Sequence, residues 1–396
     1  MRFLRAATAL LLLAPALAAA APGPRGPDIP VVATDFFAVC PNVAMSADGD
    51  FEVVWNHYYS ESHVIPQGIF ARHFDRQGRP TQATEIRLDD PGSIEASFSR
   101  VVALPQGGYF VAWFRYRGAV GGGTVGRFLD PMGNPRGPLV VLAGSAWPVA
   151  LTVVSDSLLV TWRVGEGPLR ARRFDFDGRP FKKVMHLTNQ EHLGVADVAP
   201  LADSFVVVWE RWTGTSWAVE AQRFSLAGRP LGAAIRVNDN PAGGEFRVLV
   251  ASDGDARYAM AWTKRTLSTD PQTGQQIATD EPRVRFFDAG GPSGPAKIPD
   301  QLRTRSQQAT GLAMDSRGVA LVTWDRDPVS ATSPRTSLGR FLDADGQPAG
   351  DEFPLLQNAA TGDFCPAAAT GGEDDAWVTA LLKASGVAAR RLAFED

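Results

Sequence analysis

Six tryptophans each end a run of apolar residues, and side chains that could bind a ligand follow them directly. The tryptophans are Trp55, Trp113, Trp162, Trp209, Trp262 and Trp324. The candidate ligand-binding residues after them are Asn56, His57, Arg115, Arg163, Glu210, Arg211, Trp212, Lys264, Asp325 and Arg326. Amide, charged and aromatic side chains around a shallow depression suit a glycan, peptide or protein partner. We therefore expect one polar and aromatic face, formed where the six runs leave the fold on the same side.

Some of these residues could also catalyse a reaction. A glycan hydrolase or lyase could use Glu210, Asp325, Asp327 or His57, and hydrolysis needs two carboxyl groups about 5 to 10 Å apart. The sequence contains no nucleophile elbow, phosphate loop or nucleotide fingerprint. We therefore predict a non-catalytic binding protein that needs no cofactor. A hydrolase or lyase is the alternative, and a structural component of the envelope or matrix is a third hypothesis.

Metal binding is not expected. Two turns, at 175–178 and 343–346, carry paired aspartates like the start of a calcium loop, but the further oxygen ligands of such a loop are missing. The five histidines show no zinc-site spacing. Aspartates in turns commonly accept hydrogen bonds from their own backbone, which explains these pairs without a metal.

The elements that must position the face recur along the chain. In each unit a strand ends at an aromatic residue, and a glycine and a proline follow it. The pairs are Gly78 and Pro80, Gly133 and Pro135, Gly178 and Pro180, Gly228 and Pro230, Gly290 and Pro292, and Gly346 and Pro348. Glycine takes the positive φ of a bulged hairpin turn, and proline suits the start of an edge strand. The tryptophans are 47 to 62 residues apart, which sets the length of one unit.

Units of this kind predict an all-β fold, a seven-bladed β-propeller of four-stranded antiparallel blades. The runs before the tryptophans are apolar throughout, as in strands buried on both faces. The expected domain spans residues 30–396. Its repeats fall near 41–98, 99–146, 147–194, 195–245, 246–306, 307–363 and 364–396. The last repeat ends after three strands, so residues 30–34 are predicted to add the fourth strand and close the ring.

The N-terminus has the form of a secretory signal peptide. Arg2 and Arg5 precede an apolar run and then small residues, which predicts a signal over 1–21 and a linker rich in proline and glycine over 22–29. The run is short for a membrane span and contains Pro15. No cysteine stands at the cleavage point to carry a lipid. We expect a secreted or periplasmic protein that does not insert into a membrane.

Only two cysteines are present, Cys40 and Cys365, and each precedes a proline at the start of the first or last unit. In a closed ring these units are neighbours, which predicts a disulfide in an oxidising compartment. Two unpaired thiols are the alternative. The net charge is −4, with acids and bases mixed along the chain, which argues against a nucleic-acid partner. We expect a monomer.

One unit resembles a known class of repeats. Residues 220–238, together with the strand at 205–209, are similar to repeats in large bacterial secreted proteins, some of which carry calcium-binding haemolysin-type nonapeptides. This chain has no such nonapeptides. The resemblance implies the propeller fold and export, and it implies no reaction.

Overall fold

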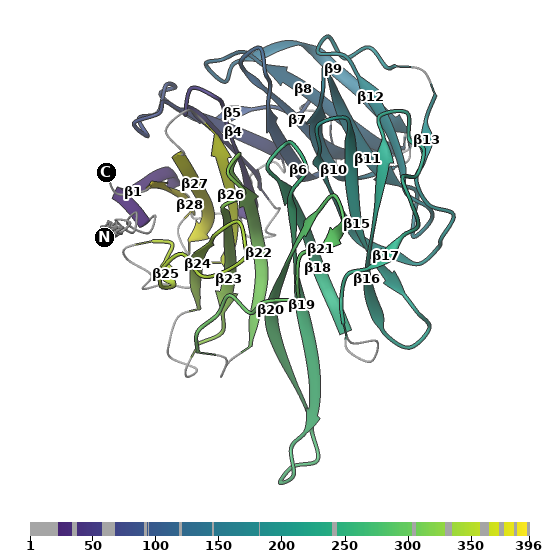
Figure 1. Ribbon diagram of the computed structural model, residues 1–396. Coiled ribbons are helices and arrows are strands. Elements are labelled where there is room, and N and C mark those ends of the chain that lie inside the picture. The colour runs from purple at the N-terminus through teal and green to yellow at the C-terminus, as the bar shows by residue number, and fades with distance from the viewer. Residues whose placement is uncertain are drawn as a thin grey trace, which may run out of the picture.

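The computed structural model describes most of the 396-residue chain. The described residues are 23–33, 38–57, 68–90, 93, 95–118, 121–144, 146–181, 183–239, 244–302, 306–328, 335–356, 364–371, 376–383 and 386–393. All regular elements in these ranges are β-strands, and they form seven four-stranded sheets. The fold is the predicted all-β, seven-bladed propeller of antiparallel blades (Figure 1).

The strands follow one another blade by blade. Blade 1 holds β2 (Ala38–Met45), β3 (Phe51–His57), β4 (Gly68–Phe74) and β5 (Ile86–Arg87). Blade 2 holds β6 (Glu95–Ala103), β7 (Tyr109–Tyr116), β8 (Gly122–Leu129) and β9 (Pro135–Gly144). Blade 3 holds β10 (Trp147–Val154), β11 (Ser157–Arg163), β12 (Arg170–Phe174) and β13 (Met185–His186). Blade 4 holds β14 (Leu193–Pro200), β15 (Ser204–Trp212), β16 (Trp217–Ser225) and β17 (Ile235–Arg236).

Blade 5 holds β18 (Gly244–Ser252), β19 (Tyr258–Thr269), β20 (Gln276–Asp288) and β21 (Gly291–Pro292). Blade 6 holds β22 (Gln307–Met314), β23 (Ala320–Arg326), β24 (Thr336–Leu342) and β25 (Phe353–Pro354). Blade 7 holds β26 (Phe364–Gly371), β27 (Ala376–Lys383), β28 (Gly386–Ala393) and β1 (Gly23–Ala33). The hairpin of β19 and β20 extends beyond the rest of the ring (Figure 1). Within the described ranges, none of the structure is a helix long and apolar enough to cross a membrane.

The first strand of each blade lies innermost. The seven first strands contact one another in the cyclic order β2, β6, β10, β14, β18, β22 and β26, and β26 returns to β2. Cys40 and Cys365 lie on these two neighbouring strands. The side chain of Cys40 falls outside the described residues, so the disulfide remains a prediction.

The N-terminal strand closes the last blade. β1 pairs antiparallel with β28, with Ile29 opposite Ala389 and Ala33 opposite Gly386. The strand already begins at Gly23, so residues 23–29 are not the expected linker. The expected signal peptide, residues 1–21, lies outside the described residues. β1 is the outermost strand of blade 7 and lies beside β28 (Figure 1).

The second strands form the hydrophobic core between the blades. Every residue of β3 is buried, and Trp55 packs with Val378 and Ala380 of blade 7. The six tryptophans of the sequence pattern are at most 5% exposed. Burying one large apolar side chain contributes on the order of 2 kcal/mol, and a tryptophan is buried in this way in six of the seven blades. These residues therefore stabilise the ring, as the apolar runs predict.

The glycine turns form at the opposite end of the ring from the tryptophans. Five of the six predicted glycines adopt a positive φ, between 71° and 82°. The exception is Gly290, where the neighbouring Gly291 takes the positive φ of 121° instead. At Gly133 an added Cβ would lie 2.5 Å from the Cβ of His73, so this turn also needs glycine for close packing against blade 1.

Every first strand carries a bulge or irregularity close to its start. The breaks in register fall after Val39, Ser97, Pro148, Leu193, Phe246, Ala309 and Phe364. Three residues at these breaks, Phe98, Arg247 and Cys365, share a φ of 57°. A bulge leaves a residue without its ladder partner and turns its side chain. The seven irregularities therefore set which backbone N–H groups and side chains meet at this end of the ring.

Candidate functional site

The residues after the tryptophans do share one end of the ring. Each second strand ends opposite the start of its own first strand, as with His57 opposite Ala38 and Arg163 opposite Trp147. We call this end the tryptophan face. The other end, which carries the glycine turns, is the turn face.

Half of the predicted ligand-binding residues are buried. Less than a tenth of the surface is exposed for Asn56, His57, Glu210, Asp325 and Arg326. The His57 ring stacks on the Phe70 ring at a centroid distance of 4.1 Å, and burial lowers the pKa of His57. The expectation that these five side chains line an open depression was wrong. They are buried, and two of them, Glu210 and Asp325, lie between blades.

Glu210 joins two blades through backbone hydrogen bonds. Its Oε2 accepts a hydrogen bond from the Val195 amide at 3.0 Å, and its Oε1 accepts one from the Arg247 amide at 2.5 Å. Val195 and Arg247 lie at the irregular starts of two adjacent first strands. Burial raises the pKa of Glu210, and the backbone hydrogen bonds act against that rise. The carboxylate therefore satisfies amides that the strand ladder leaves free.

Asp325 and Thr263 act in the same way. Asp325 Oδ2 accepts a hydrogen bond from the Cys365 amide at 3.0 Å, and its Oδ1 accepts one from the Ser337 hydroxyl at 2.6 Å. Thr263 Oγ1 accepts a hydrogen bond from the Ala309 amide at 2.9 Å. Each residue follows a tryptophan and reaches the first strand of the next blade. The two carboxyl groups proposed for catalysis, Glu210 and Asp325, are thus part of the joints between blades.

Most predicted basic residues have acidic or backbone partners. Arg115 pairs with Asp90 at 3.0 Å, and Arg211 pairs with Glu220 at 2.6 Å. Arg163 donates to the Leu193 carbonyl of the next blade.

Lys264, Arg326 and Trp212 complete the predicted set. In the ladders, Lys264 lies opposite Glu245 on one side and Glu281 on the other. Arg326 pairs with Asp300 at 2.5 Å and with Glu352 at 2.7 Å. The Trp212 ring is 39% exposed and lies 5.5 Å from the Trp217 ring on the outer hairpin of blade 4. Of these three, Trp212 offers the most accessible surface.

An aromatic patch on the tryptophan face was not predicted. It consists of Phe98, Phe114 and Trp147 at the junction of blades 2 and 3. The Trp147 ring stacks on Phe114 at 4.1 Å and meets Phe98 edge-on at 5.3 Å. Phe98 is 51% exposed and Trp147 is 38% exposed, whereas Phe114 is buried beneath them. Tyr116 lies two residues beyond Phe114, on the same side of β7, and is also exposed.

The backbone irregularity of β6 explains how the patch forms. Phe98 occupies the bulge of β6 at a φ of 57°, which an ordinary strand residue would not adopt. The sequence contains one indication of the patch, which is the position of Trp147. Trp147 stands before Pro148 at the start of a unit, the same place as Cys40 before Pro41. It is therefore not one of the tryptophans that end an apolar run.

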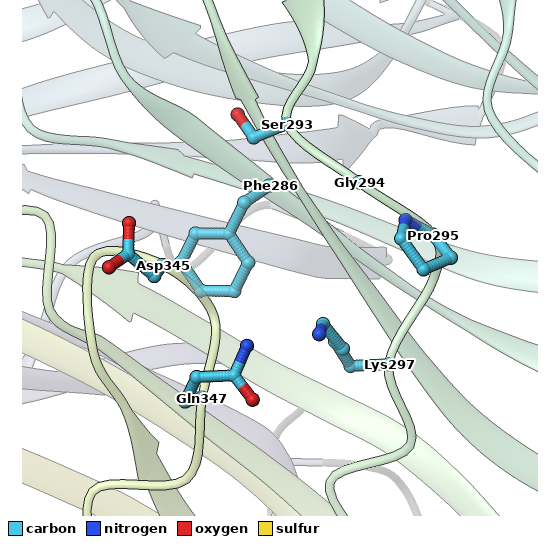
Figure 2. Close-up of a pocket in the computed structure, with 7 residues that line it drawn as sticks. All are labelled: Phe286, Ser293, Gly294, Pro295, Lys297, Asp345 and Gln347. Carbon is cyan, nitrogen blue, oxygen red and sulfur yellow. The ribbon is translucent and has the colours of Figure 1, made fainter.

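Two hollows are present at the turn face, and each lies where the outer strand of one blade meets the glycine turn of the next. The first, of about 270 Å³, lies between blades 5 and 6. Figure 2 shows the Phe286 ring in this hollow, with Asp345 and Lys297 on opposite sides of it. The second, of about 530 Å³, lies between β1 and the glycine turn of blade 1. Among the described residues, no group of three or more His, Cys, Asp or Glu side chains could hold a metal ion.

Comparisons with known proteins identify the fold. No family model and no curated protein matches the chain. Among solved structures, an ulvan lyase of polysaccharide lyase family PL25 is similar, with a TM-score of 0.56 and 10% identity, over 95% of this chain and 94% of the lyase. An α-L-arabinanase from Penicillium chrysogenum has a TM-score of 0.51 and 10% identity, over 92% of this chain and 97% of the arabinanase. At this identity the likeness shows a shared propeller fold alone.

Proposed function

We propose that the protein is a non-catalytic binding propeller that holds a glycan on its tryptophan face. The aromatic patch of Phe98, Phe114 and Trp147 carries this proposal. A contiguous aromatic surface that is exposed at the end of a rigid scaffold is typical of a binding site. The apolar face of a sugar ring can cover an aromatic ring, and the sugar hydroxyls then need polar partners at the edge of the patch.

One arginine supplies such a partner close to the patch. Arg163 lies opposite Trp147 in the ladder of blade 3, and its Nη1 donates to the Leu193 carbonyl, which holds the guanidinium at this position. Guanidinium groups donate in a fixed fork that suits vicinal hydroxyl or carboxylate oxygens. The solved propellers with a similar fold include a polysaccharide lyase and an arabinanase, which supports a glycan over a peptide as the partner.

Glu210 and Asp325 each join two neighbouring blades, and this supports binding over catalysis. A hydrolase needs one carboxyl group as a proton donor and a second as a nucleophile or base. Both oxygens of each of these carboxyl groups already accept hydrogen bonds from the protein. Burial raises the pKa of both Glu210 and Asp325, and this property favours the hydrolase or lyase alternative, because a proton donor requires it.

The test compares two tryptophans of equal exposure. Trp147 is 38% exposed and Trp212 is 39% exposed, and both lie on the tryptophan face. We expect Trp147→Ala to weaken retention on a panel of immobilised neutral and acidic polysaccharides about tenfold or more, and Trp212→Ala to change it less than twofold. Equal retention by wild type and Trp147→Ala would remove the patch as the site. Release of reducing ends or unsaturated products would establish the enzyme alternative instead.

We further propose export to an oxidising compartment and a disulfide between Cys40 and Cys365. The neighbouring positions of β2 and β26 support the disulfide, because they place the two cysteines on adjacent first strands. Expression with the full N-terminus, followed by intact mass measurement of the exported protein, tests both proposals. The mass should correspond to a chain that starts near residue 22 and lacks two hydrogens. A full-length, fully reduced chain would refute both.

A further inference from the structure

The larger hollow of the turn face is lined by three arginines from three separate elements. Arg25 belongs to β1, Arg72 to β4 and Arg391 to β28. The hollow measures about 530 Å³, within the range of small-molecule sites. It exists because β1 departs from regular pairing between Arg25 and Ile29, and this segment forms one wall.

The residues that line this hollow include three arginines and one aspartate, so positive side chains outnumber negative ones. Asp28 is the only carboxylate among the lining residues, and one of its oxygens lies 3.7 Å from the guanidinium of Arg390. Arg72 is fixed by a hydrogen bond from its Nη1 to the Val31 carbonyl at 2.6 Å, which uses a neutral acceptor. Burial lowers the pKa of Arg391, and the charge of Asp75 nearby acts against this fall. An anion in the hollow would compensate these charges.

The smaller hollow provides an internal comparison. It occupies the same place on the frame, between the outer strand of blade 5 and the glycine turn of blade 6. Its charged lining residues are one lysine, Lys297, and one aspartate, Asp345. The two hollows therefore share their backbone setting and differ in charge. The three arginines therefore occur at the junction where β1 closes the ring, and they are not a feature shared by the repeats.

We propose that the hollow lined by Arg25, Arg72 and Arg391 binds one oxyanion group, a sulfate, phosphate or carboxylate, of a small ligand. The volume of the hollow exceeds that of a bare oxyanion, so the group can be part of a larger molecule such as an acidic sugar. The proposal does not depend on the aromatic patch, because the two sites lie on opposite ends of the ring.

Calorimetric titration of the full exported chain tests the proposal. The probes are sodium sulfate, sodium phosphate and sodium glucuronate, with glucose as the neutral probe and sodium chloride holding the ionic strength constant. We expect one saturable site for at least one anion and none for glucose, and the tightest anion identifies the chemical group. Arg25→Ala and Arg391→Gln should each weaken that binding about tenfold or more.

Matched controls decide where the anion binds. Arg229 occupies the glycine turn of blade 4 and is exposed, and Lys297 lines the smaller hollow, so Arg229→Ala and Lys297→Ala should leave the affinity unchanged. If Arg391→Gln does not fold, Arg25→Ala alone suffices, because Arg25 is exposed. No saturable binding of any anion, or equal binding by wild type and Arg25→Ala, would overturn the proposal.

Discussion

The inner and outer strands of neighbouring blades are joined by different kinds of hydrogen bond. At the inner strands of the tryptophan face, Glu210, Thr263 and Asp325 accept hydrogen bonds from amides of the next blade, and Arg163 also donates to a carbonyl there. At the outer strands, arginines of the third strands donate to carbonyls of the preceding blade. These contacts run from Arg72 to Val31 at 2.6 Å, from Arg285 to Val237 at 2.7 Å and from Arg340 to Pro299 at 3.0 Å.

The strands themselves explain this difference. The irregularity in every first strand leaves amides without ladder partners at the tryptophan face, so acceptor side chains stabilise that end. The outer strands of five blades pair over only two residues, which leaves carbonyls beside them without ladder partners. Arginine has several donors in one fork and can satisfy two of these carbonyls at once.

The largest effect is expected from removing a joint of the tryptophan face. Glu210→Ala leaves the Val195 and Arg247 amides without their acceptor, and each lost hydrogen bond at a buried group costs on the order of 1–2 kcal/mol. We expect the free energy of unfolding to fall by about 3 kcal/mol, measured by urea denaturation at pH 7.

A matched variant separates the hydrogen bonds from the volume of the side chain. Glu210→Gln keeps one acceptor oxygen and nearly the same shape. Its free energy of unfolding should therefore fall by about half as much as that of Glu210→Ala. If Glu210→Ala costs less than 1 kcal/mol, the amides at the bulges have other partners and the account of this face is wrong.

The next effect is a dependence of stability on pH. Burial raises the pKa of Asp197 to about 6 and that of Glu245 to about 7, and both lie on first strands. The native protein then holds protons that the unfolded chain has already released. The free energy of unfolding should fall as the pH rises from about 4 to about 7, by on the order of 2 kcal/mol for each group.

Urea midpoints at pH 5 and pH 8 measure this dependence. We expect the midpoint to be higher at pH 5, and Glu245→Gln should reduce the difference because the amide does not titrate. A midpoint that rises between pH 5 and pH 8 would show that these acids are ionised and well paired in the native state.

A buried glutamate at the turn face gives the third prediction. Glu52 is fully buried opposite His73, while the same pair in blade 2 is Phe110 and Phe128, whose rings lie 4.5 Å apart. Within the described residues, neither carboxyl oxygen of Glu52 has a hydrogen-bond partner. Burial, and then the charge of Asp130, raises the pKa of Glu52. A carboxyl group here therefore destabilises the fold once it ionises.

Replacing it should increase stability. Glu52→Leu should raise the free energy of unfolding by about 1–2 kcal/mol at pH 8 and by less at pH 5, where the native carboxyl group holds its proton. Phe110→Leu is the control at the same position of blade 2 and should lower stability at both pH values. Loss of stability in Glu52→Leu at pH 8 would mean that Glu52 has a favourable role in the native state.

These comparisons also show what could be predicted from the sequence. The ring could be predicted because its signals are local in the sequence. Trp55 and its five counterparts end periodic apolar strands, and turn glycines such as Gly78 mark a backbone conformation. The burial of Glu210 and Asp325 depends on amides of another blade, about forty residues along the chain, and no local pattern reports it. Phe98 was missed because its exposure follows from a bulge, which the alternation of residues does not reveal.

The smallest effect concerns one joint of the outer strands. Blade 4 has Gln222 where blade 6 has Arg340, as the ladders from Val207 and Val322 show. Gln222 donates only to Gly232 of its own blade, at 2.8 Å, whereas Arg340 donates to Gly350 of its own blade and to Pro299 of the preceding one.

Arg340→Gln should therefore remove only the contact between blades and lower the free energy of unfolding by about 1 kcal/mol or less. The same urea titration as for Glu210→Ala measures it, with Gln222→Arg as the reverse variant, which should be neutral or slightly stabilising. A cost for Arg340→Gln as large as that for Glu210→Ala would mean that the arginine joints matter as much as the carboxylate joints. The proposed difference between the inner and outer joints would then be one of chemistry alone, without a difference in strength.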